Sequence, residues 1–132
     1  MKVRNFILLD DVAINNMLTR IVIKDAYPGA SFEIFTEADE CLKYLKKQTL
    51  PYPETILLLD IYMPDTDGWQ FLEEYDKLNE ALKQQIKIFA LTSSILKNDR
   101  QNSNQNKLLN GYLIKPLTDK IFIKQTFDNL TY

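Results

Sequence analysis

Five polar residues stand at the carboxyl end of apolar runs and carry side chains that can do chemistry: Asp10, Asp11, Asp60, Thr92 and Lys115. Short, unbroken apolar runs are typical of strands buried on both faces of a sheet. The carboxyl ends of parallel strands meet at one edge of the sheet, where open α/β sheets bind their ligands. We therefore expect these five side chains to converge at one rim.

The residue types at this rim point to phosphate chemistry. Carboxylates that lie close together repel one another, and one of them takes up a proton unless a cation joins them. A ligand set made only of oxygen suits Mg²⁺, which usually also binds phosphate oxygens. Lys115 adds a fixed positive charge and Thr92 a hydroxyl donor, so a phosphoryl group can be held there. A carboxylate such as Asp60 can also act as the nucleophile and form an aspartyl phosphate.

Five segments are predicted to be the strands of one parallel sheet: Phe6–Leu9, Ser31–Phe35, Ile56–Leu59, Ile86–Leu91 and Gly111–Ile114. Helical patterns separate the segments, and this alternation predicts a doubly wound α/β fold with right-handed crossovers and helices on both faces. A chain of 132 residues is enough for one domain with one core, so we expect a single domain over residues 1–132.

Apolar stripes support the helices between these strands. One stripe consists of Ile14, Met17, Leu18, Ile21 and Val22. A second stripe, which we expect in the core, consists of Ala38, Cys41, Leu42 and Leu45. We expect Thr36 with Asp39, and later Thr118, to cap helices. A helix that starts at Trp69 is expected to end near Asn79 or Lys83.

The segment from Leu96 to Asn110 is almost entirely polar. Few of its residues can be buried in a core, so we expect a weakly packed helix there.

Composition excludes several classes of function. The formal net charge is −2, which gives no support for a basic nucleic-acid-binding face. The chain has no histidine, so it cannot carry a phosphohistidine or a histidine metal site. Cys41 is the only cysteine, which excludes an internal disulfide and fits the cytoplasm. The apolar run before Asp10 is too short for a signal peptide or a membrane span.

The motifs, taken in order, resemble the receiver domain of two-component response regulators, including the single-domain chemotaxis regulators. They are Asp10-Asp11, Asp60 with Met63-Pro64 and Asp67-Gly68, Thr92-Ser93, and Lys115-Pro116. The resemblance covers essentially the whole chain. It implies a five-stranded parallel sheet in the order 2-1-3-4-5, an order taken from the family and not worked out from these residues.

The resemblance also implies roles for the metal ligands and the acceptor. Asp60 would accept the phosphoryl group from a phosphohistidine on a sensor histidine kinase or a phosphotransfer protein. Asp11 would bind Mg²⁺ directly and Asp10 mainly through water. The backbone carbonyl of Tyr62 would join Asp60 as a further metal ligand.

Thr92 and Lys115 would hold the phosphoryl oxygens, and the Lys115-Pro116 peptide would be cis. Tyr112 stands at the position of the family's switch aromatic, which turns inward when Thr92 moves toward the phosphate. The segment from Leu96 to Asn110, the Tyr112 strand and the last helix would then contact a downstream protein. The family also commonly forms homodimers through this face.

Two residues depart from the common pattern. Val12 stands where a third acidic or polar residue is frequent, which would slightly weaken metal binding. Tyr62 is bulkier than many residues two places after the acceptor, and we hypothesise that it shields an aspartyl phosphate from water.

Other functions remain open at this stage. In aspartyl-phosphate phosphatases a second acidic group stands two residues after the nucleophile, but this chain has Tyr62 there, so we expect a switch and not a turnover enzyme. Two further alternatives are a binding module that is not phosphorylated and a receiver fragment of a longer regulator with a DNA-binding or enzymatic output. Asp65 and Asp67 suggest a calcium loop, but no EF-hand spacing follows them.

Overall fold

The computed structural model describes residues 4–63, 66–93 and 107–132. Its centre is one sheet of five parallel strands: β1 (Asn5–Leu9), β2 (Ser31–Phe35), β3 (Thr55–Asp60), β4 (Ile86–Thr92) and β5 (Leu109–Ile114). The strand order is β2-β1-β3-β4-β5. This order and the doubly wound α/β class confirm what the sequence and the resemblance implied.

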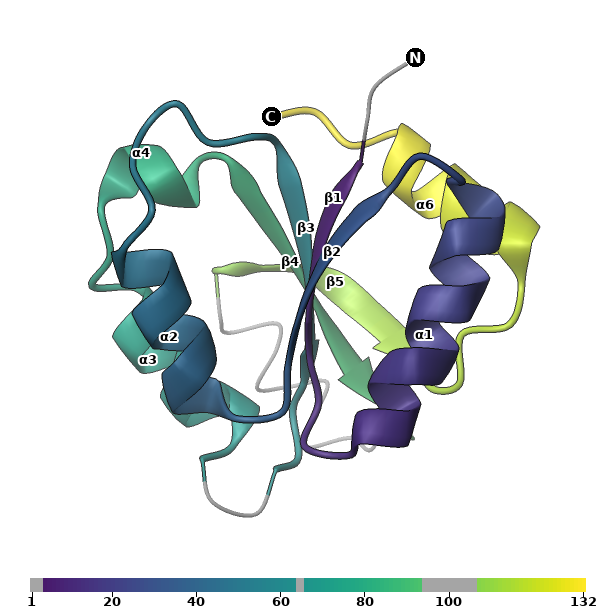
Figure 1. Ribbon diagram of the computed structural model, residues 1–132, viewed down its shortest axis with the longest axis horizontal. Coiled ribbons are helices and arrows are strands. Elements are labelled where there is room, and N and C mark those ends of the chain that lie inside the picture. Colours follow the sequence, from purple (N-terminus) through teal and green to yellow (C-terminus); the bar gives the residue numbers. More distant parts are fainter. Residues whose placement is uncertain (1–3, 64–65, 94–106) are drawn as a thin grey trace.

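Helices cover both faces of the sheet (Figure 1). On one side lie α1 (Ala13–Ala26) and α6 (Lys120–Asp128), and on the other lie α2 (Ala38–Lys46), α3 (Gly68–Tyr75) and α4 (Glu80–Lys83). Each face has its own apolar cluster, and the strands contribute alternate residues to the two clusters. Every residue of β3 is buried, as its unbroken apolar run predicted for the central strand.

Most of the apolar stripe of α1 faces solvent, which the sequence pattern did not reveal, whereas its last residue, Val22, is partly buried against the apolar cluster beneath α1 and α6. The buried residues of α1 are Asn16, Thr19, Ile23 and Ala26. The aliphatic residues on its opposite side are about half exposed, namely Ile14 (57%), Met17 (55%), Leu18 (50%) and Ile21 (59%). Periodicity locates a stripe but does not say whether the core or the solvent receives it. In α2, by contrast, the expected stripe from Ala38 to Leu45 is buried.

Several predicted helix ends are wrong by a few residues. Glu37 is the N-cap of α2 and makes no side-chain capping bond, so the expected Thr36 cap is absent. Asp119, and not Thr118, caps α6 by accepting from two backbone N–H groups. The helix after Gly68 ends at Tyr75, and a separate short helix, α4, follows it.

Most of the polar segment from Leu96 to Asn110 lies outside the described residues. Its last two residues, Leu109 and Asn110, belong to β5, which begins two residues earlier than predicted. At this point the pairing of β4 with β5 shifts between Ile88 and Phe89. The Asn110 side chain accepts a hydrogen bond from the Ile88 N–H at 3.1 Å, which satisfies a donor at the irregularity.

The carboxyl-terminal residue is held at the amino edge of the sheet. The Tyr132 hydroxyl donates to the carbonyl of Thr55, the first residue of β3, at 2.6 Å. The Lys87 ammonium lies 5.3 Å from the centre of the Tyr132 ring. This edge is opposite the one at which β1 and β3 end (Figure 1).

None of the helices in residues 4–63, 66–93 and 107–132 has the length and apolar character needed to span a bilayer.

Candidate functional site

The strand ends bring the predicted site residues to one rim. Asp10 follows β1, Asp60 closes β3, Thr92 closes β4 and Lys115 follows β5. The register pairs Leu9 with Leu59, and it pairs Thr92 with Ile114, so these ends lie level across the sheet. Asp10, Asp60 and Thr92 are all buried at 3% exposure or less.

Three carboxylates form the centre of the rim. Asp10, Asp11 and Asp60 each offer one oxygen, and these oxygens lie within 4.8 Å of one another. Backbone N–H groups help to orient two of the carboxylates: Val12 donates to Asp10 Oδ1 at 2.9 Å, and Tyr62 donates to Asp60 Oδ1 at 3.2 Å. The sequence prediction that these three residues converge is confirmed.

Lys115 joins the cluster from β5. Its Nζ lies 3.3 Å from Asp10 Oδ2 and 3.4 Å from Asp60 Oδ1, so one ammonium bridges two carboxylates. The Lys115 N–H also donates to the Thr92 carbonyl at 2.8 Å, which fixes the lysine beside the end of β4. The peptide between Lys115 and Pro116 is cis, as the resemblance implied.

One lysine does not neutralise three carboxylates, and the excess negative charge affects the pKa of Asp60. The pKa of the Asp60 carboxyl is raised to about 7, first by burial and then by the nearby Asp10 charge, while Lys115 acts in the opposite direction and lowers it. A hydrogen bond with Asp11 acts in the same direction as burial. The arrangement therefore stores excess negative charge that a cation would relieve.

The donor set fits Mg²⁺. Three carboxylate oxygens within 4.8 Å of one another, without nitrogen or sulfur, are a ligand set that hard divalent cations prefer. The backbone carbonyl of Tyr62 follows the acceptor by two residues, and the Tyr62 side chain is 52% exposed at the rim. The three carboxylates match the acidic part of the ligand set that the resemblance implied, and the Tyr62 carbonyl stays a prediction.

The chain after β3 turns sharply at Gly68, where α3 begins. The Gly68 N–H donates to the Ile61 carbonyl at 2.8 Å. A Cβ at this glycine would lie 2.8 Å from Ile61 Cα and 3.2 Å from the Asp60 carbonyl oxygen. Asp67 caps α3 in a capping box with Gln70, so its carboxylate serves the helix and not a calcium loop.

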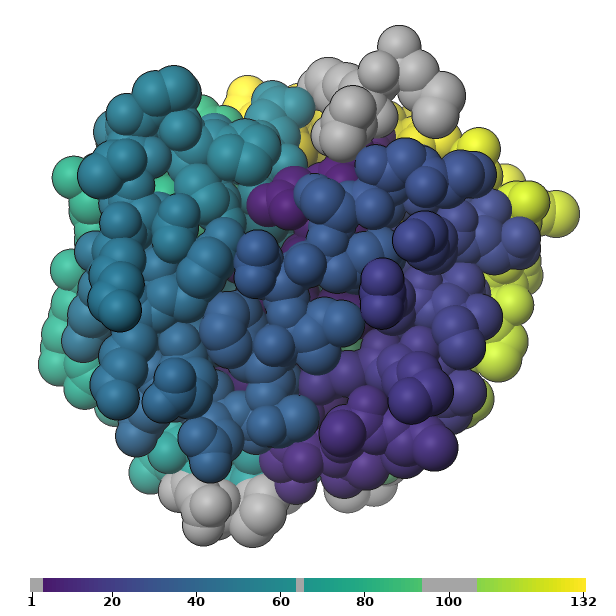
Figure 2. Space-filling model, in the orientation of Figure 1, coloured from purple at the N-terminus to yellow at the C-terminus, as the bar shows by residue number. Residues whose placement is uncertain are grey.

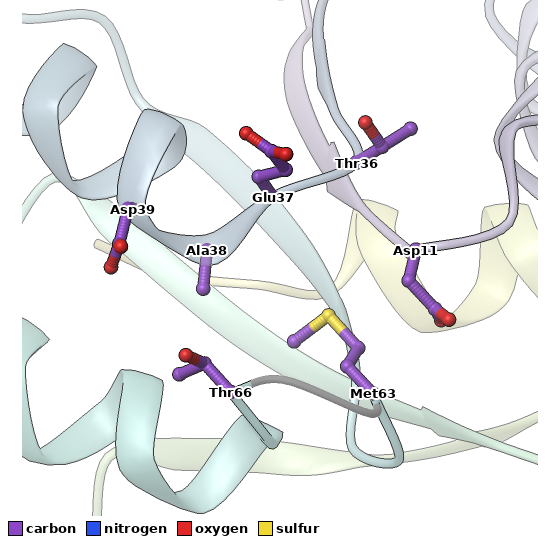
Figure 3. Close-up of a pocket in the computed structure, with 7 residues that line it drawn as sticks. All are labelled: Asp11, Thr36, Glu37, Ala38, Asp39, Met63 and Thr66. Atoms are coloured by element: carbon purple, nitrogen blue, oxygen red, sulfur yellow. The ribbon is translucent and has the colours of Figure 1, made fainter.

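A cavity of about 190 Å³ opens beside Asp11 (Figure 3). It lies between the β2–α2 loop and the loop after β3, and the Met63 side chain extends into the space between Ala38 and Asp11. Glu37 and Asp39 line it as well, so the approach to the carboxylates from this side is acidic. The negative electrostatic potential of these acidic residues attracts cations toward the site.

Tyr112 lies on β5 and packs against the apolar cluster of α2, α3 and α4. It pairs with Ala90 of β4, two residues before Thr92. Tyr112 therefore lies close in the sheet to Thr92, the residue that ends β4.

Sequence reasoning missed two features next to the rim. One is the buried Asn16, which donates to backbone carbonyls at the ends of β1 and β2. The other is the solvent-facing apolar stripe of α1, whose amino end adjoins Asp11. The only sequence signal for these two features was that Asn16 is a polar residue on the side of the helix opposite the apolar stripe.

Comparison with known protein families decides the identity of this arrangement. The family model of the response regulator receiver domain matches residues 6–126. The chain belongs to this family. Receiver domains are signalling switches of two-component systems, and they interact with histidine kinases or phosphotransfer proteins.

Solved receiver structures share the fold over nearly their whole length. A response regulator receiver protein from Dyadobacter fermentans is 26% identical, with a TM-score of 0.84 over 94% of this chain and 98% of its own. A two-component response regulator from Cytophaga hutchinsonii is 22% identical, with a TM-score of 0.84 over 97% and 96%. A sequence comparison with curated proteins finds no match.

A further receiver relative contains a metal ion. The receiver domain of the sensor histidine kinase PA1611 from Pseudomonas aeruginosa is 21% identical, with a TM-score of 0.74 over 95% of this chain and 94% of its own. A magnesium ion is coordinated in its active-site cleft. Receiver domains bind Mg²⁺ at an acidic cluster, and this receiver has such a cluster in Asp10, Asp11 and Asp60.

Proposed function

We propose that this receiver accepts a phosphoryl group on Asp60, and that the whole chain, residues 1–132, acts as one switch domain. The observation that carries the proposal is the cluster itself: three carboxylate oxygens within 4.8 Å of one another, with Lys115 bridging Asp10 and Asp60. No turnover of a separate substrate is required, so the protein is a switch and not an enzyme in the usual sense.

The transfer consists of one bond broken and one bond formed. A phosphohistidine on a sensor histidine kinase or phosphotransfer protein loses its N–P bond, and an Asp60 carboxylate oxygen forms the new O–P bond. The partner must supply the histidine because this chain has none. Mg²⁺ neutralises phosphoryl charge when bound, and Asp10, Asp11, Asp60 and the Tyr62 carbonyl would hold it.

The chain's own groups orient the phosphoryl group. Lys115 is fixed at the rim by its backbone bond to Thr92 and points its ammonium at the acceptor. Thr92 closes the neighbouring strand β4, one residue after Leu91, which pairs with Asp60. We assign both residues to the phosphoryl oxygens, and we assign Thr92 with Tyr112 to the switch that alters contacts with a downstream protein or a second copy.

The exposed stripe of α1 offers a docking surface for the phosphoryl donor. The exposed stripe consists of four aliphatic residues on the solvent side of the helix: Ile14, Met17, Leu18 and Ile21. Figure 2 shows α1 and β2 side by side on the face that leads down to the rim. Because this apolar stripe lies next to the acceptor Asp60, it suits a phosphoryl donor in which the reactive histidine stands on a helix beside an apolar face.

Intact mass spectrometry tests the acceptor. We expect incubation with acetyl phosphate and Mg²⁺ to add one phosphoryl group to the chain, and we expect Asp60→Asn to prevent the addition. Glu73→Gln removes an exposed carboxylate and serves as the control, which should be phosphorylated like the native chain. Addition that persists in Asp60→Asn would refute Asp60 as the acceptor.

The two alternative readings give different results in the same assay. A binding module that is not phosphorylated would show no mass gain and no Mg²⁺ binding. A receiver cut from a longer regulator would be phosphorylated normally, and its output would need the missing part.

A further inference from the structure

Asn16 is a buried polar residue that belongs neither to the acceptor nor to the metal ligands. It lies on the inner face of α1 at 3% exposure, a face that continues with Thr19 and then with the apolar Ile23 and Ala26. A buried amide destabilises a fold unless its polar atoms are paired. Its partners therefore indicate what it does.

The Asn16 side chain ties three elements together. Its Nδ2 donates to the Asp10 carbonyl at 3.1 Å and to the Phe35 carbonyl at 3.0 Å. The Phe35 carbonyl also accepts from the Asp10 N–H at 3.2 Å. Asp10 is thus held through both of its peptide groups, with its N–H bound to the end of β2 and its C=O bound to α1.

The carbonyl that Asn16 holds is part of the planar peptide between Asp10 and Asp11. Because a peptide unit rotates as a rigid plane, fixing this carbonyl also fixes the direction in which the Asp11 backbone leaves it. Asp10 is anchored further by its carboxylate, which meets the Val12 N–H and Lys115. The hydrogen bond from Asn16 to the Asp10 carbonyl therefore sets the peptide plane that leads into Asp11.

We propose that Asn16 is a positioning residue for the Mg²⁺ site, because its amide fixes the Asp10–Asp11 peptide and through it the Asp11 carboxylate. The inference rests on the proposed function. Mg²⁺ requires nearly ideal octahedral geometry, so the orientation of each carboxylate affects its affinity. Substitution of a group that orients a metal ligand typically lowers metal affinity by roughly 10- to 100-fold.

The amide is suited to this place because it donates two bonds without carrying charge. A lysine or arginine here would bring a positive charge beside the carboxylates and compete with the cation. An aspartate would lose both donors and add a fourth negative charge. Leucine has a similar size and cannot donate, so Asn16→Leu removes the bonds without changing the charge of the site.

The test measures Mg²⁺ affinity by isothermal titration calorimetry at pH 7.5, on variants whose fold is verified by circular dichroism. We expect Asn16→Leu to weaken Mg²⁺ binding about 10-fold. Ile23→Val removes a methylene from the same helix face, away from the acidic loop, and controls for lost stability. We expect its Mg²⁺ affinity to stay within about twofold of the native value, since the loop is untouched.

A second measurement separates positioning from loss of the acceptor. For Asn16→Leu, the Mg²⁺ concentration that gives half the maximal rate of phosphorylation by acetyl phosphate should rise by the same factor as the dissociation constant. The maximal rate should stay close to native. If Asn16→Leu does not fold, Asn16→Ala removes the same donors and should show the same loss.

Two results would overturn the inference: native Mg²⁺ affinity in a folded Asn16→Leu or Asn16→Ala variant, or an equal loss of affinity in Ile23→Val. Failure of the proposed function looks different. If the native chain takes up no phosphoryl group, but Mg²⁺ binding still depends on Asn16 and not on Ile23, the positioning role stands and the acceptor role of Asp60 fails.

Discussion

The three crowded carboxylates at the rim lead us to predict that Asp60→Asn changes the stability of the fold. Asp60→Asn replaces the acceptor with a neutral side chain of the same shape. Its Oδ1 can still accept from the Tyr62 N–H, and Lys115 keeps its 3.3 Å contact with Asp10. Without Mg²⁺ at pH 8, we expect the variant to be more stable than the native chain, because it removes one of three crowded carboxylates.

The magnitude follows from the pKa of the Asp60 carboxyl, which is about 7 in the folded chain against an ordinary value of 3.8. At about 1.4 kcal/mol per pH unit, ionising Asp60 in the fold costs at most about 4 kcal/mol. The rim opens to water beside Asp11, and solvent there screens the charges, so we expect about 2 kcal/mol. For a domain of this size that corresponds to a rise in Tm of roughly 5–10 °C.

The sign depends on pH. The folded-state pKa is raised, so the folded chain binds the Asp60 proton more tightly than the unfolded chain does between about pH 4 and pH 7. The cost is therefore fully present above about pH 7 and is relieved as the pH falls toward 4. The advantage of Asp60→Asn should be largest at pH 8 and less than half as large at pH 5.

Urea denaturation with EDTA at pH 8 and pH 5 measures both quantities. Glu73→Gln, which removes an exposed carboxylate, controls for the change in net charge. Adding Mg²⁺ at 100 times its dissociation constant should stabilise the native chain by about 2.7 kcal/mol and stabilise Asp60→Asn less. If Asp60→Asn were no more stable than the native chain at pH 8, or equally favoured at pH 5, charge repulsion would not be the dominant effect at this rim.

Three further substitutions test other parts of the site. Gly68→Ala places a Cβ 2.8 Å from Ile61 Cα, and we expect unfolding to become about 2 kcal/mol easier in urea; native stability would show that the turn relaxes freely. Asp67→Ala removes the N-cap of α3 and should cost about 1 kcal/mol with Mg²⁺ affinity unchanged; a change in that affinity would contradict a purely capping role. Tyr62→Asn should speed the loss of the phosphoryl mass from Asp60, and an unchanged decay rate would show that the exposed Tyr62 ring does not shield it.

The rim was predictable because its signal is local to each strand. An unbroken apolar run shows a buried strand, and the polar residue that ends it must lie at the carboxyl edge of a parallel sheet. For this reason the convergence of Asp60 and Lys115 could be predicted without any knowledge of their distance. The strand order came only from the family resemblance.

What the sequence did not reveal depends on contacts between elements. The periodicity of α1 shows a stripe, but it does not show that the inner face of the helix approaches the ends of β1 and β2, where Asn16 is buried in place of a larger aliphatic residue. The N-cap of α6 lies one residue later than predicted. Thr118 and Asp119 are both good capping residues, and only the path of the chain selects Asp119.

The position of Tyr132 has a practical consequence for studying this receiver. Its hydroxyl is bound to Thr55 at the beginning of β3, while the acceptor stands at the end of the same strand. A surface tether, a fluorophore or a fused reporter attached beyond Tyr132 would leave from the side of the sheet away from Asp60 (Figure 1). The receiver could thus be immobilised through this end on a sensor chip with its acceptor rim and the exposed stripe of α1 facing the solution.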